Sequence, residues 1–225
     1  MKLDLWAALD ATVVNEELDD YLTNTESGGR WSKALYFLTQ ENKCYVQPFL
    51  ERALTDIEIP KSYYRADDWW RCAVMSVEYF REAFQIEIPI ELIRDTGDMA
   101  SRFDASYIFA FDVSYNMLCS EVVINHHLNY VSDTYLSPRD LIGMLAHETW
   151  CAHQVNQAMK FLRRENGIID FEAINPAGFA NRGAIYALSN IVMYVDNGMG
   201  GVYRCQMAEA EAIYIQHQVN AHLVS

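Results

Sequence analysis

The chain has 225 residues, of which 51% are apolar, 13% aromatic and 21% charged. This composition can fill a buried core and excludes intrinsic disorder. The 17 Lys and Arg residues are outnumbered by 31 Asp and Glu residues, which gives a formal net charge of −14. Such a charge repels phosphate backbones and anionic lipid surfaces, so we expect no nucleic-acid and no membrane partner.

The N-terminus and the cysteines both indicate a reducing compartment. Residues 1–6 contain an early acid and no apolar signal-peptide core, and no run of about 18 apolar residues occurs. The five cysteines are widely spaced in a chain too large to need disulfides. We predict a cytoplasmic protein that forms a single domain over 1–225, with an N-terminal helical part (1–85) and a second part (86–225).

Helical patterns dominate the first part. Apolar residues recur at three- to five-residue steps from Leu5 to Leu22, and residues 23–30 have the composition of a loop. Further helices are predicted over 31–54, with an interruption near Pro48, and over 67–84, with Asp67 as the expected N-cap.

The second part combines a small sheet with further helices. The predicted strands are 86–90, 107–111 and 122–124. Ser137-Pro138-Arg139-Asp140 then supplies a cap, a proline at the first helical position and an acid three residues after the cap, which predicts a long helix to about Arg164. A loop over 165–183 and helices over 184–194 and 203–222 complete the chain. The predicted fold class is α+β, mainly helical with a small sheet.

The long helix carries the one crowded group of metal-ligating side chains, His147-Glu148-Thr149-Trp150-Cys151. His147 and Cys151 are four residues apart, about 40° around a helix, so both can face one ion. The pattern is that of the H-E-x-x-H zinc motif with cysteine at the second histidine position, and thiolate is also a good zinc ligand. Glu148 then stands where that motif has its general base. His153 lies about 240° from His147 and cannot share the ion while the helix is continuous.

With these residues the chain resembles the gluzincin-type zinc metallopeptidases. The metal helix matches over 147–152, except at Cys151, and the segment 203–212 resembles the later helix that supplies a carboxylate ligand. The resemblance implies a zincin-like fold, Zn²⁺ held by His147, Cys151 and Glu209, Glu148 as general base, and a peptide or protein substrate. It also implies that the strand at 121–125 is a sheet edge that pairs with extended substrate. Glu211 competes with Glu209 as third ligand, but it lies about 200° around the helix from Glu209, and we prefer Glu209.

Three functions remain open on the sequence. The first is a zinc-dependent metallopeptidase-like protein that hydrolyses peptide bonds with metal-activated water. The second is a catalytically weak or inactive pseudoenzyme that acts as a protein-binding module, because a thiolate and a carboxylate reduce the net charge of a zinc site to about zero and so activate water less. In the third, no metal binds and His147 and Cys151 are packing residues. His126, His127, His217 and His222 are expected at the surface, and Tyr203 is a candidate donor to an oxyanion.

Overall fold

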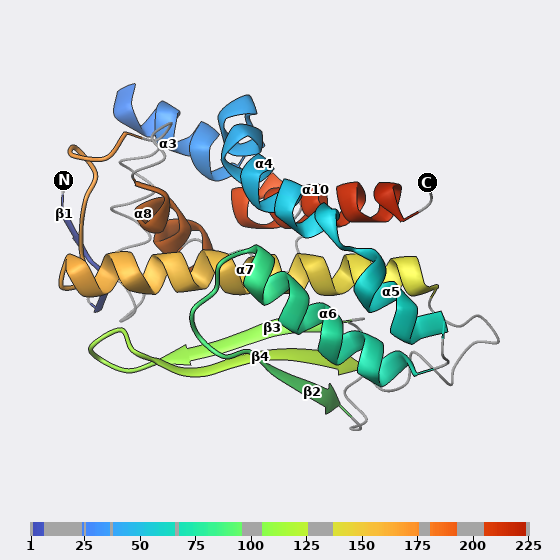
Figure 1. The fold of residues 1–225 in the computed structure, drawn as a ribbon. Coiled ribbons are helices and arrows are strands. Elements are labelled where there is room, and N and C mark those ends of the chain that lie inside the picture. Colours follow the sequence, from blue (N-terminus) through green and yellow to red (C-terminus); the bar gives the residue numbers. More distant parts are fainter. Residues whose placement is uncertain are drawn as a thin grey trace. The chain divides into compact units, whose positions relative to one another are not determined.

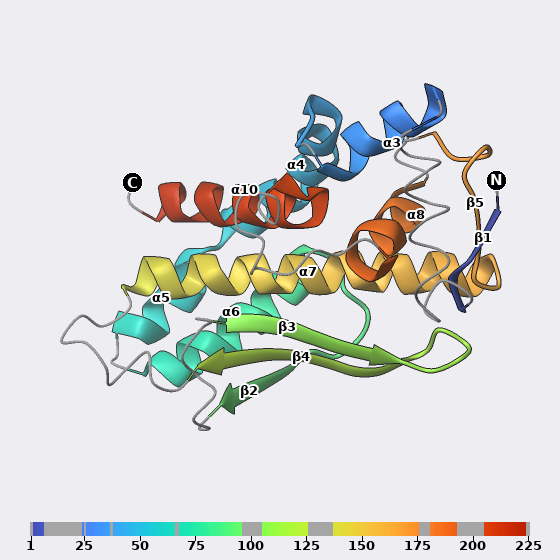
Figure 2. The same ribbon diagram turned by 180° about the vertical axis from the view of Figure 1, so that it is seen from behind.

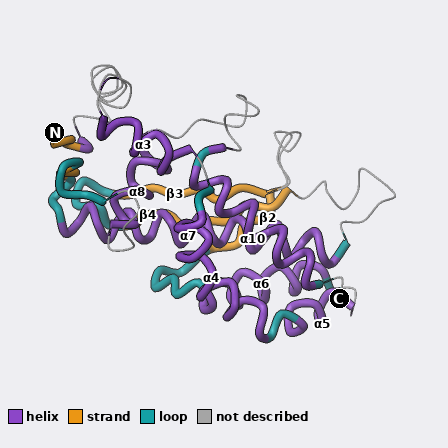
Figure 3. The backbone as a smooth tube through the Cα atoms, turned by 90° about the horizontal axis from the view of Figure 1, so that it is seen from above, coloured by secondary structure: helices purple, strands orange, loops and turns teal. Residues whose placement is uncertain are grey.

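The computed structural model describes residues 2–6, 24, 26–36, 38–65, 68–95, 105–125, 137–175, 181–192 and 205–223. These residues confirm the predicted α+β class, because helices predominate and the strands form small sheets (Figure 1, Figure 3). None of the helices in these ranges has the length and apolar character needed to cross a membrane.

The described residues form eight helical segments and five strands. The helices are α3 (Glu26–Tyr36), α4 (Gln40–Thr55), α5 (Glu58–Arg65), α6 (Trp69–Ala83), α7 (Pro138–Arg164), α8 (Arg182–Ala187), the π-helix η3 (Leu188–Val192) and α10 (Met207–His222). The strands are β1 (Lys2–Asp4), β2 (Glu91–Asp95), β3 (Ala105–Phe111), β4 (Met117–Asn125) and β5 (Ile168–Asp170).

The chain divides into two compact units, each assembled from several segments. Unit 1 comprises residues 1–45, 112–116 and 154–211, and unit 2 comprises residues 46–111, 117–153 and 212–225. Helices α7 and α10 each have residues in both units and are continuous where the division falls. The prediction of a single domain stays a prediction.

Unit 2 contains a three-stranded mixed sheet in the order β2-β4-β3. Strand β4 pairs in parallel with β2 and antiparallel with β3, and it lies between them in the sheet (Figure 1, Figure 2). Val122 and Ile124 on β4 are buried, which fits an apolar face turned towards a core. The prediction that residues 121–125 form a sheet edge is wrong, because β4 has hydrogen-bonded neighbours on both sides, β2 on one and β3 on the other.

Local hydrogen bonds confirm the predicted start of α7 and correct that of α6. Ser137 Oγ accepts from the backbone N–H of Asp140 at 3.1 Å and donates to its carboxylate at 2.6 Å. This capping box stabilises the first turn of a helix that ends, as predicted, at Arg164. In α6 the cap is Asp68 rather than Asp67, because the Asp68 carboxylate accepts the backbone N–H of Arg71 at 3.1 Å.

Other predicted boundaries move for local reasons. Residues 26–30 belong to α3 and not to a loop, and the break in the stretch 31–54 falls at 38–39 instead of at Pro48. Thr39 explains the break, because its Oγ1 accepts the backbone N–H of Asn42 at 3.3 Å and caps a new helix. The strand predicted over 86–90 begins at Glu91, since Pro89 has no N–H to donate to a neighbouring strand. The helix predicted over 5–22 falls mostly outside the described residues.

Unit 1 contains the antiparallel pair β1 and β5, the second half of α7, α8 and η3. Helix α8 approaches α7 closely at Gly183, where a Cβ would lie 2.5 Å from Cβ of Phe161 and 2.8 Å from the carbonyl oxygen of Gln157. The carbonyl oxygen is a backbone atom and Cβ is the first atom of its side chain. Neither atom can therefore move away by side-chain rotation. A glycine at position 183 is therefore needed for this helix packing.

Substitution of Gly183 by alanine is expected to destabilise the protein by about 1–3 kcal/mol, because the added methyl group overpacks the α7–α8 contact. Gly29→Ala is the matched control: nothing lies within 4 Å of its added Cβ, and alanine favours a helix over glycine by about 0.5–1 kcal/mol. Urea unfolding followed by circular dichroism measures both. Equal stability of the two variants would contradict the packing argument.

Candidate metal centre

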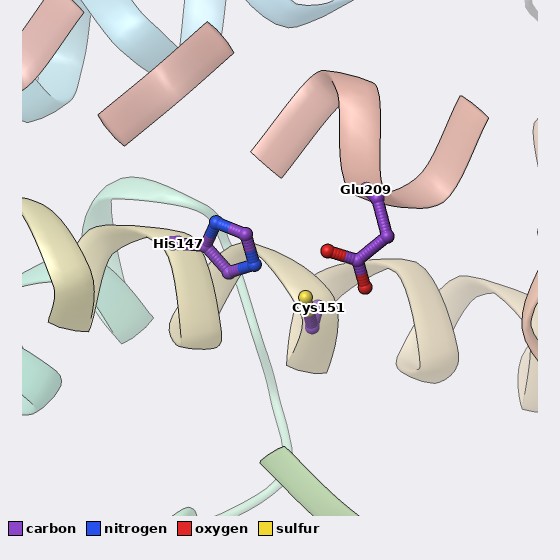
Figure 4. Close-up of side chains that lie close together, drawn as sticks. All are labelled: His147, Cys151 and Glu209. Carbon is purple, nitrogen blue, oxygen red and sulfur yellow. The ribbon is translucent and has the colours of Figure 1, made fainter. Parts of the chain in front are cut away.

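Two of the predicted ligands lie one turn apart on α7. His147 is half-buried and Cys151 is 9% exposed, and Figure 4 shows both side chains on the same side of the helix. The capping box at Ser137 and the absence of any break between 138 and 164 keep the four-residue spacing helical. The local sequence therefore accounts for the pairing of His147 with Cys151.

The third side chain comes from the first turn of α10. Glu209 is 3% exposed, and its carboxylate is directed towards His147 and Cys151 (Figure 4). One ligand atom from each of the three residues lies within 4.8 Å of the other two. A tetrahedral zinc ion, with bonds of about 2.0–2.3 Å, holds its ligand atoms roughly 3.3–3.8 Å apart. The donor set of imidazole, thiol and carboxylate fits such an ion after small side-chain rotations.

Glu148 follows His147 directly on α7 and is half-buried. Its carboxylate is not one of the three clustered groups. A residue adjacent in a helix lies about 100° around the axis, so Glu148 belongs to the flank of the face that carries His147 and Cys151. This is the place that a proton acceptor beside a metal would occupy.

His153 is a packing residue in unit 2. Its ring is fully buried, and its Nδ1 lies 2.7 Å from the carbonyl oxygen of Phe84. The imidazole also stacks on Trp150 with ring centroids 4.5 Å apart and an interplanar angle of 18°. These contacts agree with the expectation that His153 does not share an ion with His147.

Tyr107 on β3 is a neighbour of the centre that the sequence analysis missed. Its hydroxyl lies 3.0 Å from Oγ of Ser120 on β4. Burial raises the pKa of Tyr107 and is the largest cause of the shift. The hydrogen bond with Ser120 lowers this pKa, and the charge of Cys151 raises it. The Tyr107 phenol therefore stays protonated near Cys151. Nothing in the strand pattern distinguishes this tyrosine from a packing residue.

Glu211 lies outside the clustered ligand group and makes its own buried network in unit 1. Its Oε1 accepts from Nδ2 of Asn42 at 2.9 Å, and its Oε2 accepts from the hydroxyl of Tyr186 at 2.9 Å and from Nε2 of Gln154 at 3.2 Å. Arg182 forms the ion pair, with Nη1 3.4 Å from Oε1. Both charged side chains are buried, at 0% exposure for Glu211 and 4% for Arg182.

Two phenols beside this network are held in the neutral form. The pKa of Tyr45 is raised to about 12, chiefly by burial and next by the negative charge of Glu211. The positive charge of Arg182 lowers this pKa in part. Burial also raises the pKa of Tyr186, with the Glu211 charge as the next cause. Both tyrosines therefore keep their O–H at neutral pH, and Tyr186 remains a donor to Glu211.

The remaining candidates lie away from the cluster or outside the described residues. His217 and His222 are exposed on α10, as expected for surface residues. His126, His127 and Tyr203 lie outside the described residues. The network around Glu211 was missed because its members come from distant parts of the sequence. A signal does exist, since Glu211 occupies the buried stripe formed by Ala208, Ile215 and Val219 on α10.

Comparison with protein-family models, with curated proteins and with solved structures found no match to this chain. The resemblance to gluzincin-type metallopeptidases therefore stays a prediction. Any conclusion about function rests on the residues of the candidate centre.

Proposed function

We propose that the protein is a zinc-dependent, gluzincin-like metallopeptidase whose ion is held by His147, Cys151 and Glu209. The observation that carries the proposal is the convergence of imidazole, thiol and carboxylate atoms within 4.8 Å of one another. Catalytic zinc sites typically have three protein ligands, drawn from imidazole, thiolate and carboxylate groups, and a water or substrate in the fourth position. A zincin-like arrangement of α7 and α10 is part of the same proposal.

Bound zinc would supply Lewis acidity towards a substrate carbonyl and would make a nearby water more acidic. Glu148 would accept the proton of the attacking water and deliver it to the leaving amine nitrogen. His147, Cys151 and Glu209 would hold the ion with fixed geometry. The nearly complete burial of Cys151 and Glu209 limits the access of bulk water to their side.

The second candidate is a metal-binding pseudoenzyme that recognises a protein partner. It is favoured by the presence of Cys151, because a thiolate together with the Glu209 carboxylate would neutralise the two positive charges of zinc. A less positive ion activates water less than one held by two neutral histidines and one carboxylate. This candidate predicts metal binding without hydrolysis.

A thiolate ligand also indicates the kind of cellular compartment in which the protein works. None of the five cysteines, all of which lie in the described residues, forms a disulfide, and two of them, Cys44 and Cys205, are exposed. Exposed and ligating thiols persist where thiols are kept reduced. We therefore propose that the protein works in the cytoplasm. The proposed substrate is a peptide or a protein. The net charge of −14 argues against a nucleic-acid or membrane partner.

The metal content of the purified protein tests the proposal. We expect about one zinc ion per chain, and less than about 0.1 per chain in Cys151→Ser and Glu209→Gln, because each removes one of three protein ligands. Elemental mass spectrometry after zinc loading under reducing conditions and desalting measures the content.

Two substitutions of exposed residues serve as matched controls. Cys44→Ser changes an exposed thiol on α4, and Glu78→Gln changes an exposed carboxylate on α6. Both are expected to keep the wild-type zinc content. Wild-type protein that binds no zinc, or equal zinc content in all variants, would contradict the proposed centre.

A further inference from the structure

We propose that Glu211 is a positioning residue whose buried network holds the first turn of α10 so that Glu209 faces the metal centre. This inference rests on the proposed function, because it assigns a role relative to the ligand Glu209. The hydrogen bonds between Gln154 on α7 and the first turn of α10 support it.

Within each unit, described residues of α7 and α10 contact each other. In unit 2, Gly143 leaves space for the side chain of Asn220, whose amide oxygen a Cβ at position 143 would overlap. In unit 1, Nε2 of Gln154 donates to the carbonyl oxygen of Ala208 at 3.1 Å and to the Glu211 carboxylate at 3.2 Å.

Gln154 is the residue through which α7 hydrogen-bonds the first turn of α10 in unit 1. It lies three residues after Cys151 on the same continuous helix, and its two acceptors, on Ala208 and Glu211, lie on either side of Glu209. Rotation or sliding of the first turn of α10 would break both hydrogen bonds. The bonds therefore fix the rotation and the position of the helix turn that carries Glu209.

The other partners of Glu211 keep its carboxylate in place. Arg182 supplies the charge that a fully buried carboxylate requires, and its guanidinium lies 4.7 Å from the centre of the Tyr45 ring. The hydroxyl of Tyr186 and the amide of Asn42 each donate at 2.9 Å. Both oxygens of Glu211 are thus engaged by protein donors, which is the arrangement of an anchor and not of a metal ligand.

Co²⁺ binding provides the test, because the visible spectrum of the ion reports its ligand geometry. Tyr186→Phe removes one donor to Glu211 and keeps both buried charges, and Glu211→Gln removes the anchor itself. We expect both variants to bind Co²⁺ about 10–100-fold more weakly than wild type in a competition assay. The d–d bands should shift while the thiolate-to-Co²⁺ band of Cys151 persists.

The matched control is Tyr79→Phe, since the Tyr79 hydroxyl also makes protein hydrogen bonds, to the carbonyl oxygen of Ala53 at 2.9 Å and from the N–H of Asp56 at 3.0 Å. It should lose stability without any change in Co²⁺ affinity or spectrum. If Glu211→Gln does not fold, the Co²⁺ affinity and spectrum of Tyr186→Phe alone test the positioning role of Glu211.

The possible outcomes separate this inference from the proposed function. Wild-type affinity and spectrum in Tyr186→Phe and Glu211→Gln, with binding lost in Glu209→Gln, would overturn the positioning role and leave the metal centre standing. Wild-type protein that binds no Co²⁺ and no zinc would overturn both. Equal weakening in Tyr79→Phe would show a general effect of stability and would also overturn the positioning role.

Discussion

Glu148→Gln is expected to lower the rate of peptide hydrolysis by about 10²–10⁴-fold, because glutamine cannot accept the proton of the attacking water. The amide has nearly the same shape as the carboxylate, and Glu148 is not one of the clustered ligand groups, so zinc content should stay at the wild-type level. Cleavage of a fluorogenic peptide library by zinc-loaded protein measures the rate, and chelator sensitivity identifies the metal-dependent part.

Glu78→Gln is the control for this experiment, since it makes the same chemical change on the exposed surface of α6. It should leave cleavage unchanged. Metal-dependent cleavage that persists in Glu148→Gln would refute the role of Glu148 as general base. Wild-type protein that binds zinc but cleaves no peptide would refute the peptidase and favour the protein-binding pseudoenzyme.

Arg182→Met is expected to destabilise the protein by about 3–5 kcal/mol, because it leaves the Glu211 carboxylate buried without its cation. Glu211 is fully buried, so water cannot replace the lost charge. Methionine fills much of the space of the arginine stem, which limits the effect of cavity formation. The free energy of unfolding in urea measures the loss.

A double substitution and an exposed ion pair serve as controls. Arg182→Met combined with Glu211→Gln should be less destabilised than Arg182→Met alone, because the amide oxygen still accepts hydrogen bonds while the unpaired charge is gone. Arg164→Met removes an exposed partner of Glu165 at 2.7 Å and should change stability by less than about 1 kcal/mol. Equal losses for Arg164→Met and Arg182→Met would contradict the importance of burial.

Short-range chemistry in the sequence determined the parts of the fold that were predicted well. Ser137 and Asp140 make the capping box of α7 through neighbouring residues alone, and the apolar run 107–111 lies within β3. The pairing of His147 with Cys151 also depends only on helical periodicity. For each of these features, the residues that decide the outcome lie within a few positions of one another.

Tertiary structure decided the features that depend on residues far apart in the chain. Strand β4 became central because β2 and β3 both pair with it, which its own β-branched residues cannot reveal. Glu209 and Glu211 were both candidate ligands on the sequence, yet Glu211 forms a hydrogen bond with Asn42, which is 169 positions away. A buried carboxylate is stable only where hydrogen-bond donors and a cation surround it. The packing of helices that are distant in sequence brings those groups together.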